Sequence, residues 1–184
     1  MERTGQSLFR TVFGMMMSPS ATIRDAVRST HPAFSLGVSS LAFGLFFLQT
    51  GLDLYRVGQK GMTFVVFSLV AGLLYGVVII PLIGLIGYGM LKTVKTEWTL
   101  SSAVSSFCLS YSSALVYGAI GLVFSLALGW RTAVAFGVSG VLWAIGPLIL
   151  SVREMTDNDL RISILLVTLF SSVVLLSWSV FSGL

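Results

Sequence analysis

Five long stretches of the chain contain no charged side chain, and together they take up most of its 184 residues. They cover residues 29–52, 61–91, 98–130, 132–152 and 162–184. Each is at least as long as the ~20 residues that cross a bilayer as a helix. The stretches are continuously apolar instead of alternating, and a bilayer offers no water to backbone groups, so we expect helices and not a barrel. The sequence therefore predicts an all-α, polytopic membrane protein with five transmembrane helices.

The amino-acid composition excludes a soluble domain. Charged residues make up only 10% of the chain and hydrophobic residues 55%, whereas a soluble domain usually has about a quarter charged residues. The net charge of +4 comes from basic residues that stand singly at the ends of the apolar stretches, as membrane topology requires. Nucleic acid is therefore not an expected partner.

The expected transmembrane domain covers residues 32–184, with spans near 33–52, 62–91, 100–128, 132–152 and 162–183. Basic residues flank these spans unequally. Arg3, Arg10, Arg24, Arg28, Lys92, Lys95, Arg153 and Arg161 lie on one side, and Arg56, Lys60 and Arg131 lie on the other. The positive-inside rule then places the N-terminus in the cytoplasm, and an odd number of spans places the C-terminus outside.

Residues 1–31 are expected to form a cytoplasmic or interfacial amphipathic segment ahead of the first span. Apolar residues recur there at helical spacing, among them Phe9 and Phe13, while Arg3 and Arg10 are charged. In a helix at the membrane surface, the phenylalanines would enter the apolar layer and the arginines would meet anionic headgroups. The apolar face could equally pack on the transmembrane helices, and the sequence does not separate these alternatives.

Small residues in the first two stretches predict close helix packing. Gly72 and Gly76 have the G-x-x-x-G spacing that lets two helix backbones approach each other. Packing inside one subunit is the favoured interpretation because glycine is frequent throughout the chain, and an interface between two copies is the alternative. Gly37 and Gly44 in the first stretch are further candidates for helix packing.

The third stretch is the most polar of the five, and we expect it to pack centrally. Its Ser105, Tyr111, Ser112 and Tyr117 carry hydroxyls, which inside a membrane bond across helices or to their own backbone. A structural role is therefore favoured. The alternative is that these residues, with Tyr88 of the second stretch, line a cavity for a lipid headgroup or a small polar solute.

The sequence offers no catalytic constellation. No Asp, Glu, Lys, Arg or His lies at the expected midplane of a span, where such residues usually mark proton relays and ion pathways. The only histidine, His31, is far in sequence from Glu154, Asp157 and Asp159, and no serine has a base at motif spacing. We therefore expect a non-enzymatic protein with no metal site and no cofactor.

Short motifs around the second and third stretches resemble those of a known family. They are Gly-Tyr-Gly at 87–89, Thr-Glu-Trp-Thr-Leu-Ser-Ser-Ala at 96–103, Leu-Ser-Tyr-Ser-Ser at 109–113, Met-Ser-Pro at 17–19 and Thr-Ile-Arg at 22–24. Together they resemble the Yip domain family, the Ypt/Rab-GTPase-interacting membrane proteins with five spans and a cytoplasmic N-terminus. The resemblance implies a role in organising membrane or partner proteins, as in membrane trafficking or homeostasis.

One departure from the family affects the expected partners. Eukaryotic members carry Asp-Leu-Tyr-Gly-Pro, but here Asp53, Leu54 and Tyr55 are followed by Arg56. This argues against binding of a Rab-type GTPase. The resemblance points to a bacterial or archaeal type of member in the cytoplasmic membrane, with the lipid bilayer and other membrane proteins or a second copy as partners. The alternative hypothesis is a transporter or channel for a lipid or small solute, lined by the third span.

Overall fold

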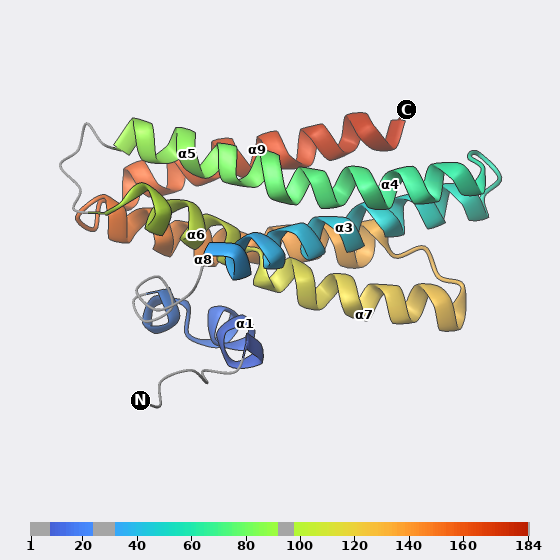
Figure 1. Cartoon of the computed structure of the whole chain (residues 1–184), viewed down its shortest axis with the longest axis horizontal. Coiled ribbons are helices and arrows are strands. Elements are labelled where there is room, and N and C mark those ends of the chain that lie inside the picture. The colour runs from blue at the N-terminus through green and yellow to red at the C-terminus, as the bar shows by residue number, and fades with distance from the viewer. Residues whose placement is uncertain (1–7, 24–31, 92–97, 184) are drawn as a thin grey trace.

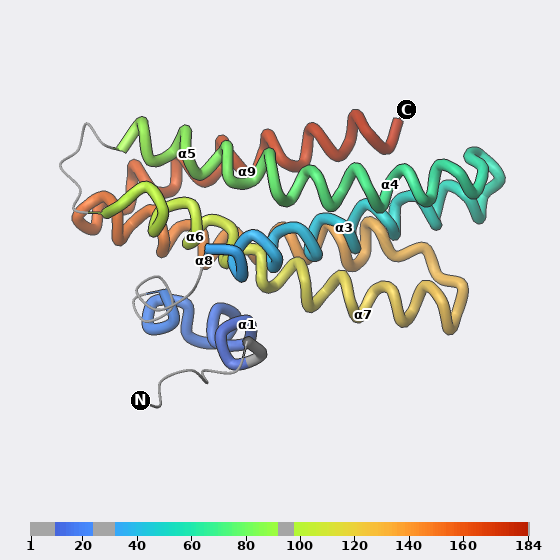
Figure 2. Tube along the Cα trace, in the orientation of Figure 1, coloured from blue at the N-terminus to red at the C-terminus, as the bar shows by residue number. Residues whose placement is uncertain are grey.

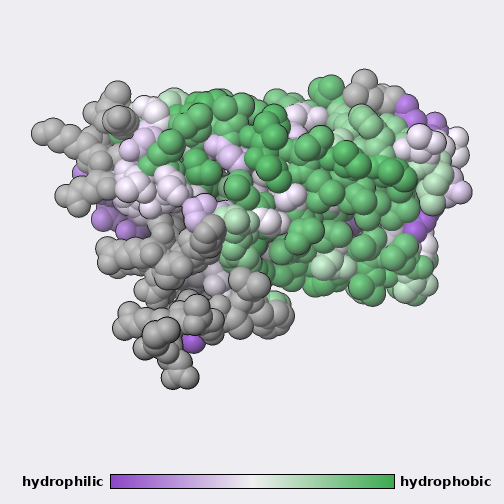
Figure 3. Space-filling model, viewed as in Figure 1, coloured by the Kyte–Doolittle hydropathy of each residue, from purple (hydrophilic) through white to green (hydrophobic). Residues whose placement is uncertain are grey.

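The computed structural model describes residues 8–23, 32–91 and 98–183, and the regular elements within these residues are all helices. Five helical units in this part of the chain are long and apolar enough to cross a membrane, namely Pro32–Arg56, Met62–Leu91, Leu100–Leu128, Ala133–Met155 and Leu160–Gly183. They form a bundle of antiparallel passes (Figure 1), and the chain reverses direction between successive passes (Figure 2). A hydrophobic belt separates two more polar ends (Figure 3). The all-α, polytopic fold is thus confirmed.

The first pass, α3 (Pro32–Arg56), is the central helix of the bundle. In the most apolar part of this pass, 56% of the residues are buried, compared with 39% in the third pass and 28% in the second. It begins at a proline, which suits the first helical position, and ends at an arginine, which suits the negative end of the helix dipole. The third pass is also central over its first half, as expected, because Ser105, Ser110 and Tyr111 are buried. The large aromatic side chains Phe43, Phe46 and Phe47 lie on α3 and are buried by its neighbours.

The second pass contains a wide turn just before a proline. It consists of α4 (Met62–Leu74), the π-helical turn η1 (Tyr75–Ile79) and α5 (Ile80–Leu91). Pro81 has no backbone N–H, and its ring would collide with the carbonyl one turn earlier in a regular α-helix. An inserted π turn makes room for such a ring, so the pass continues as helix on both sides of Pro81.

The third pass is broken at Tyr111. Helix α6 (Leu100–Ser110) starts at Thr99, whose side-chain oxygen accepts a hydrogen bond from the Ser102 backbone at 3.2 Å. Tyr111 leaves the helical region with φ −84° and ψ 14°, and α7 (Ser112–Leu128) follows. Gly129 ends α7 with φ +66°, a left-handed conformation that glycine adopts without a steric penalty.

The last two passes pack together at only one end. The fourth consists of η2 (Ala133–Val138) and α8 (Ser139–Met155), and the fifth is α9 (Leu160–Gly183). The first half of α9 is buried against α8. Its second half instead reaches the first two passes, because Phe181 stacks on Phe64 and Phe67 of α4 with ring centroids 5.6 and 6.0 Å apart. Helix α9 therefore diverges from η2 toward the α3–α4 end of the bundle.

A short helix, α1 (Leu8–Met17), lies outside the five passes at the end where α3 begins (Figure 1). Its ribbon is foreshortened in the view that shows the passes at full length, so α1 runs across them. Val12, Met15 and the nearby Ile23 are buried in a small cluster that includes Val38 of α3 and Leu109 of α6. This apolar contact attaches α1 to the bundle.

Candidate functional site

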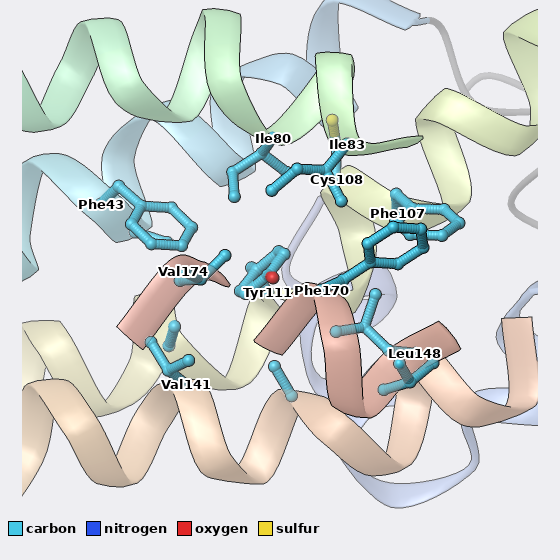
Figure 4. Close-up of a cluster of buried hydrophobic side chains, with 14 of the residues drawn as sticks. Phe43, Ile80, Ile83, Phe107, Cys108, Tyr111, Val141, Leu148, Phe170 and Val174 are labelled. Atoms are coloured by element: carbon cyan, nitrogen blue, oxygen red, sulfur yellow. The ribbon is translucent and has the colours of Figure 1, made fainter. Parts of the chain in front are cut away.

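Tyr111 lies at the centre of the main core, not at a cavity wall (Figure 4). Only 1% of the Tyr111 surface is exposed. The ring meets Phe43 of α3 edge-on, with centroids 4.9 Å apart at an interplanar angle of 64°. Ile80 of α5, Val141 of α8 and Val174 of α9 belong to the same cluster, so Tyr111 lies in a core to which all five passes contribute.

The serine hydroxyls of the third pass connect α6 to α8. Ser106 donates a hydrogen bond to the hydroxyl of Ser151 at 2.7 Å, and Ser110 lies 3.2 Å from the same oxygen. These three residues are fully buried. The sequence indicated hydroxyl pairing in the third pass, but it gave no signal that Ser151 of the fourth pass would be the partner.

The residues predicted to line a cavity do not converge on one. Ser105 is buried, and Ser112 is fully buried and donates to the Leu109 carbonyl of its own pass at 2.7 Å. Tyr117 is half-buried and stacks on Trp143 of α8, with centroids 6.5 Å apart. Tyr88 is half-buried against the core from α5. Together with Tyr111, these side chains are spread over separate contacts.

Three of the four predicted packing glycines lie where α3 meets the second pass. A side chain at Gly72 would collide with the Phe43 carbonyl, and one at Gly76 would collide with the Ser39 carbonyl. A side chain at Gly44 would meet Leu73 of α4 at 2.7 Å. The G-x-x-x-G spacing thus serves packing inside one subunit. The prediction that Gly37 serves helix packing is wrong, because a side chain at this position would meet no atom within 4 Å.

Gln49 of α3 is a buried polar residue that the sequence analysis missed. It is fully buried, and its amide nitrogen donates a hydrogen bond of 2.8 Å to the Gly118 carbonyl of α7. Its side-chain oxygen Oε1 has no hydrogen-bond partner. Glutamine is uncharged, so it does not stand out among residues selected by charge. Its amide nevertheless requires hydrogen-bond partners in a membrane interior. The bond joins the first and third passes.

Helix α1 presents two apolar faces. Val12 and Met15 face the bundle, whereas Phe13 is 39% exposed and Met17 is 84% exposed. Arg10 is also exposed. Of the two alternatives for this segment, packing on the transmembrane helices is therefore realised by one face, while Phe13 and Met17 on the other face are exposed. Arg3 and the side chain of Phe9 lie outside the described part of the chain.

At the opposite end of the bundle, Asp53 and Arg56 of α3 hold the loop between the third and fourth passes. The Asp53 oxygen Oδ2 accepts hydrogen bonds from the backbone N–H groups of Thr132 and Ala133, both at 2.9 Å. The Arg56 guanidinium donates to the backbone carbonyls of Ser125 at 2.6 Å and Trp130 at 3.0 Å. These contacts satisfy backbone groups at the end of α7 and at the start of η2.

A cavity of about 270 Å³ lies beside this polar group. Its wall comes from Thr50, Asp53 and Leu54 of α3, from Arg131, Ala133 and Val134 near the start of η2, and from Trp178 and Ser182 of α9. Thr50 and Ala133 are buried, whereas Arg131 and Val134 are exposed, so the cavity has an inner floor and an open rim. No sequence pattern indicates this site, because its residues come from three distant segments.

No protein-family model, no curated protein and no solved structure matches this chain. The fold itself defines the class. Five helices of sufficient length and apolar character, with an exposed hydrophobic belt, make this an all-helical integral membrane protein (Figure 3). Within the described residues, no group of three or more His, Cys, Asp or Glu side chains is placed to hold a metal ion.

Proposed function

We propose that this integral membrane protein is a non-enzymatic scaffold of the Yip type, which organises membrane or partner proteins through its N-terminal segment. The proposal places α1 on the cytoplasmic side, as the distribution of basic residues predicts. The single observation that carries it is the two-faced character of α1. One face fixes the helix to the bundle, and the other leaves Phe13 and Met17 exposed.

The packing of the inner face supports a fixed position for α1. Met15 and Ile23 have no exposed surface, and they meet side chains from α3 and α6. Burial of a side chain of this size contributes about 1.5–3 kcal/mol, enough to hold a short helix in place. The exposed apolar side chains of α1 are therefore presented at a constant position relative to the spans.

The interior of the bundle favours a scaffold over a transporter lined by the third pass. That alternative requires Tyr111 and Ser112 to face a cavity. Both are instead surrounded by protein, with exposures of 1% and 0%. Aromatic and aliphatic side chains from several passes fill the space around the Tyr111 ring (Figure 4).

Site-specific photo-crosslinking in native membranes tests the scaffold role. A photoreactive residue at Met17 should form adducts with other membrane proteins, because this position is 84% exposed. The same residue at Met15, which is fully buried on the same helix, provides the matched control and should form adducts within the chain. Replacing Phe13 with Asp should abolish the protein adducts at position 17 without changing thermal stability.

The outcome that contradicts the proposal is equally specific. If position 17 forms adducts only with lipid, α1 is a membrane-surface helix without a protein partner. The scaffold role then fails, whereas the fold and the packing of α1 remain as described.

A further inference from the structure

We infer that the cavity between α3, η2 and α9 binds a phospholipid, with the phosphate at Arg131 and the adjoining glycerol and first acyl carbons on the apolar wall. The inference concerns the end of the bundle opposite α1, so it is independent of the scaffold role. Charge, shape and depth in the membrane each support it.

Two cations, Arg56 and Arg131, lie near the single carboxylate of Asp53, so the charged group at the cavity is positive overall. Asp53 and Arg56 lie 3.7 Å apart and neutralise each other, and both are occupied with backbone groups of the loop. Arg131 lines the same cavity and is exposed, and it donates no hydrogen bond to any described residue. A guanidinium recognises phosphate through paired hydrogen bonds, so Arg131 favours an anionic phosphate over an uncharged group.

The rest of the cavity wall is mainly apolar, and the side-chain polar groups of Thr50, Trp178 and Ser182 are already paired. Leu54, Val134 and the Trp178 ring form its sides. The Trp178 N–H donates to the Thr50 hydroxyl at 2.9 Å, and Thr50 in turn donates to the Phe46 carbonyl at 3.1 Å. A fully polar ligand would therefore find few partners beyond Arg131. An amphiphile, charged at one end and apolar at the other, fits this distribution.

The path of α9 explains why the cavity opens beside the membrane. At one end of the bundle α9 packs on α8, and at the other end its Phe181 stacks on Phe64 of α4. A gap consequently forms between α9 and η2, next to α3. The rim residue Val134 is apolar and 67% exposed, which leaves an entrance for a lipid.

The cavity also lies at the depth where phosphates are found. Its residues belong to the last turns of α3 and α9 and the first turn of η2, at the end of the hydrophobic belt. Trp130 is exposed at the same end, and tryptophan favours the headgroup region of a membrane. A volume of about 270 Å³ holds a headgroup with the start of its chains, while the remaining acyl carbons stay in the bilayer.

Native mass spectrometry of the full chain in an uncharged maltoside detergent tests the site. Short-chain phosphatidylglycerol is titrated into delipidated protein, and inorganic phosphate and an uncharged diacylglycerol are titrated separately. Arg131→Gln should weaken phosphatidylglycerol binding about tenfold, the loss expected for one charge-assisted contact. Ser182→Trp, which fills the cavity from α9, should have an effect of similar size.

Two matched controls separate the site from general effects. Arg161→Gln removes the same charge from an exposed position in the first turn of α9, far from the cavity. Ser179→Trp adds the same bulk to an exposed position on the same helix as Ser182. Both should bind phosphatidylglycerol like the unmodified protein. Circular dichroism verifies that every variant retains its helical content.

Three results would overturn the inference. If the cavity variants bind phosphatidylglycerol as tightly as their controls, the cavity is not the binding site. Inorganic phosphate that binds through Arg131 and displaces phosphatidylglycerol at similar concentration would make it a simple anion site. Diacylglycerol that binds as well as phosphatidylglycerol would show that Arg131 has no part in recognition.

Discussion

Asp53 and Arg56 lie one helical turn apart at the end of α3, with 3.7 Å between carboxylate and guanidinium, and each holds one side of the loop that joins α7 to η2. The ion pair itself contributes little, because partly exposed pairs are screened by solvent. The hydrogen bonds to the backbone of the loop matter more, since unpaired backbone groups at helix ends are costly. One turn of the first pass thus fixes the connection between the third and the fourth.

Replacing Asp53 should therefore destabilise the protein. Asp53→Ala leaves two backbone N–H groups without their acceptor and should lower the free energy of unfolding by about 1–2 kcal/mol. Asp53→Asn should cost less, because the amide oxygen still accepts. Denaturation by sodium dodecyl sulfate in mixed micelles measures both. Gln59→Ala, in the exposed turn after α3, is the control, and equal losses for Asp53→Ala and Gln59→Ala would disprove the capping role.

Adding a side chain between α3 and α4 should be more damaging than adding one elsewhere. Gly76→Ala places a methyl group against the Ser39 carbonyl, and neither backbone can move freely, so we expect a loss of about 1–3 kcal/mol. Gly89→Ala, where a side chain would meet no atom within 4 Å, should be neutral or slightly stabilising. Thermal unfolding in detergent compares the two. Similar midpoints for both variants would contradict the close approach.

The hydroxyl pair between Ser106 and Ser151 should show a measurable coupling energy. A double-mutant cycle with Ser106→Ala and Ser151→Ala is expected to give about 0.6 kcal/mol, the usual value for hydrogen bonds between membrane helices. Ser101, which is exposed at the start of α6, supplies the control cycle with Ser151 and should give no coupling. A coupling energy of zero in the first cycle would mean that the bond adds nothing to stability.

The orientation of the bundle remains a prediction from the basic residues. A reporter fused before residue 1 should be active in the cytoplasm, and one fused after residue 184 should be active outside, because five passes separate the two positions. The reverse arrangement would show that the excess of arginine and lysine does not set the orientation. It would also place α1 on the wrong side for the proposed function.

The spans were predictable because their length and hydrophobicity are local properties of the sequence. The arrangement of the spans was not, because it depends on which faces meet. Tyr111 was named for its hydroxyl, with a structural role favoured over a cavity lining, but only packing shows that it breaks the third pass and lies in the core. Gly72 and Gly37 look alike in sequence, yet only Gly72 meets a neighbouring backbone.

The cavity was harder still to anticipate. Its components, such as Thr50, Arg131 and Ser182, are individually ordinary, and no spacing rule connects them. They line one cavity because α9 diverges from η2 and leaves a space beside α3. That divergence depends on aromatic contacts between Phe181 and α4. A pattern within one helix contains no information about such a crossing.

The path of α9 also has a consequence for biosynthesis. Because it packs on α8 at one end and on α4 at the other, the fifth pass joins the fourth pass to the second. During translation, Phe64 and Phe67 lack their aromatic partner Phe181 until α9 has been inserted. A chain that ends before α9 consequently lacks both ring contacts that Phe181 makes with α4.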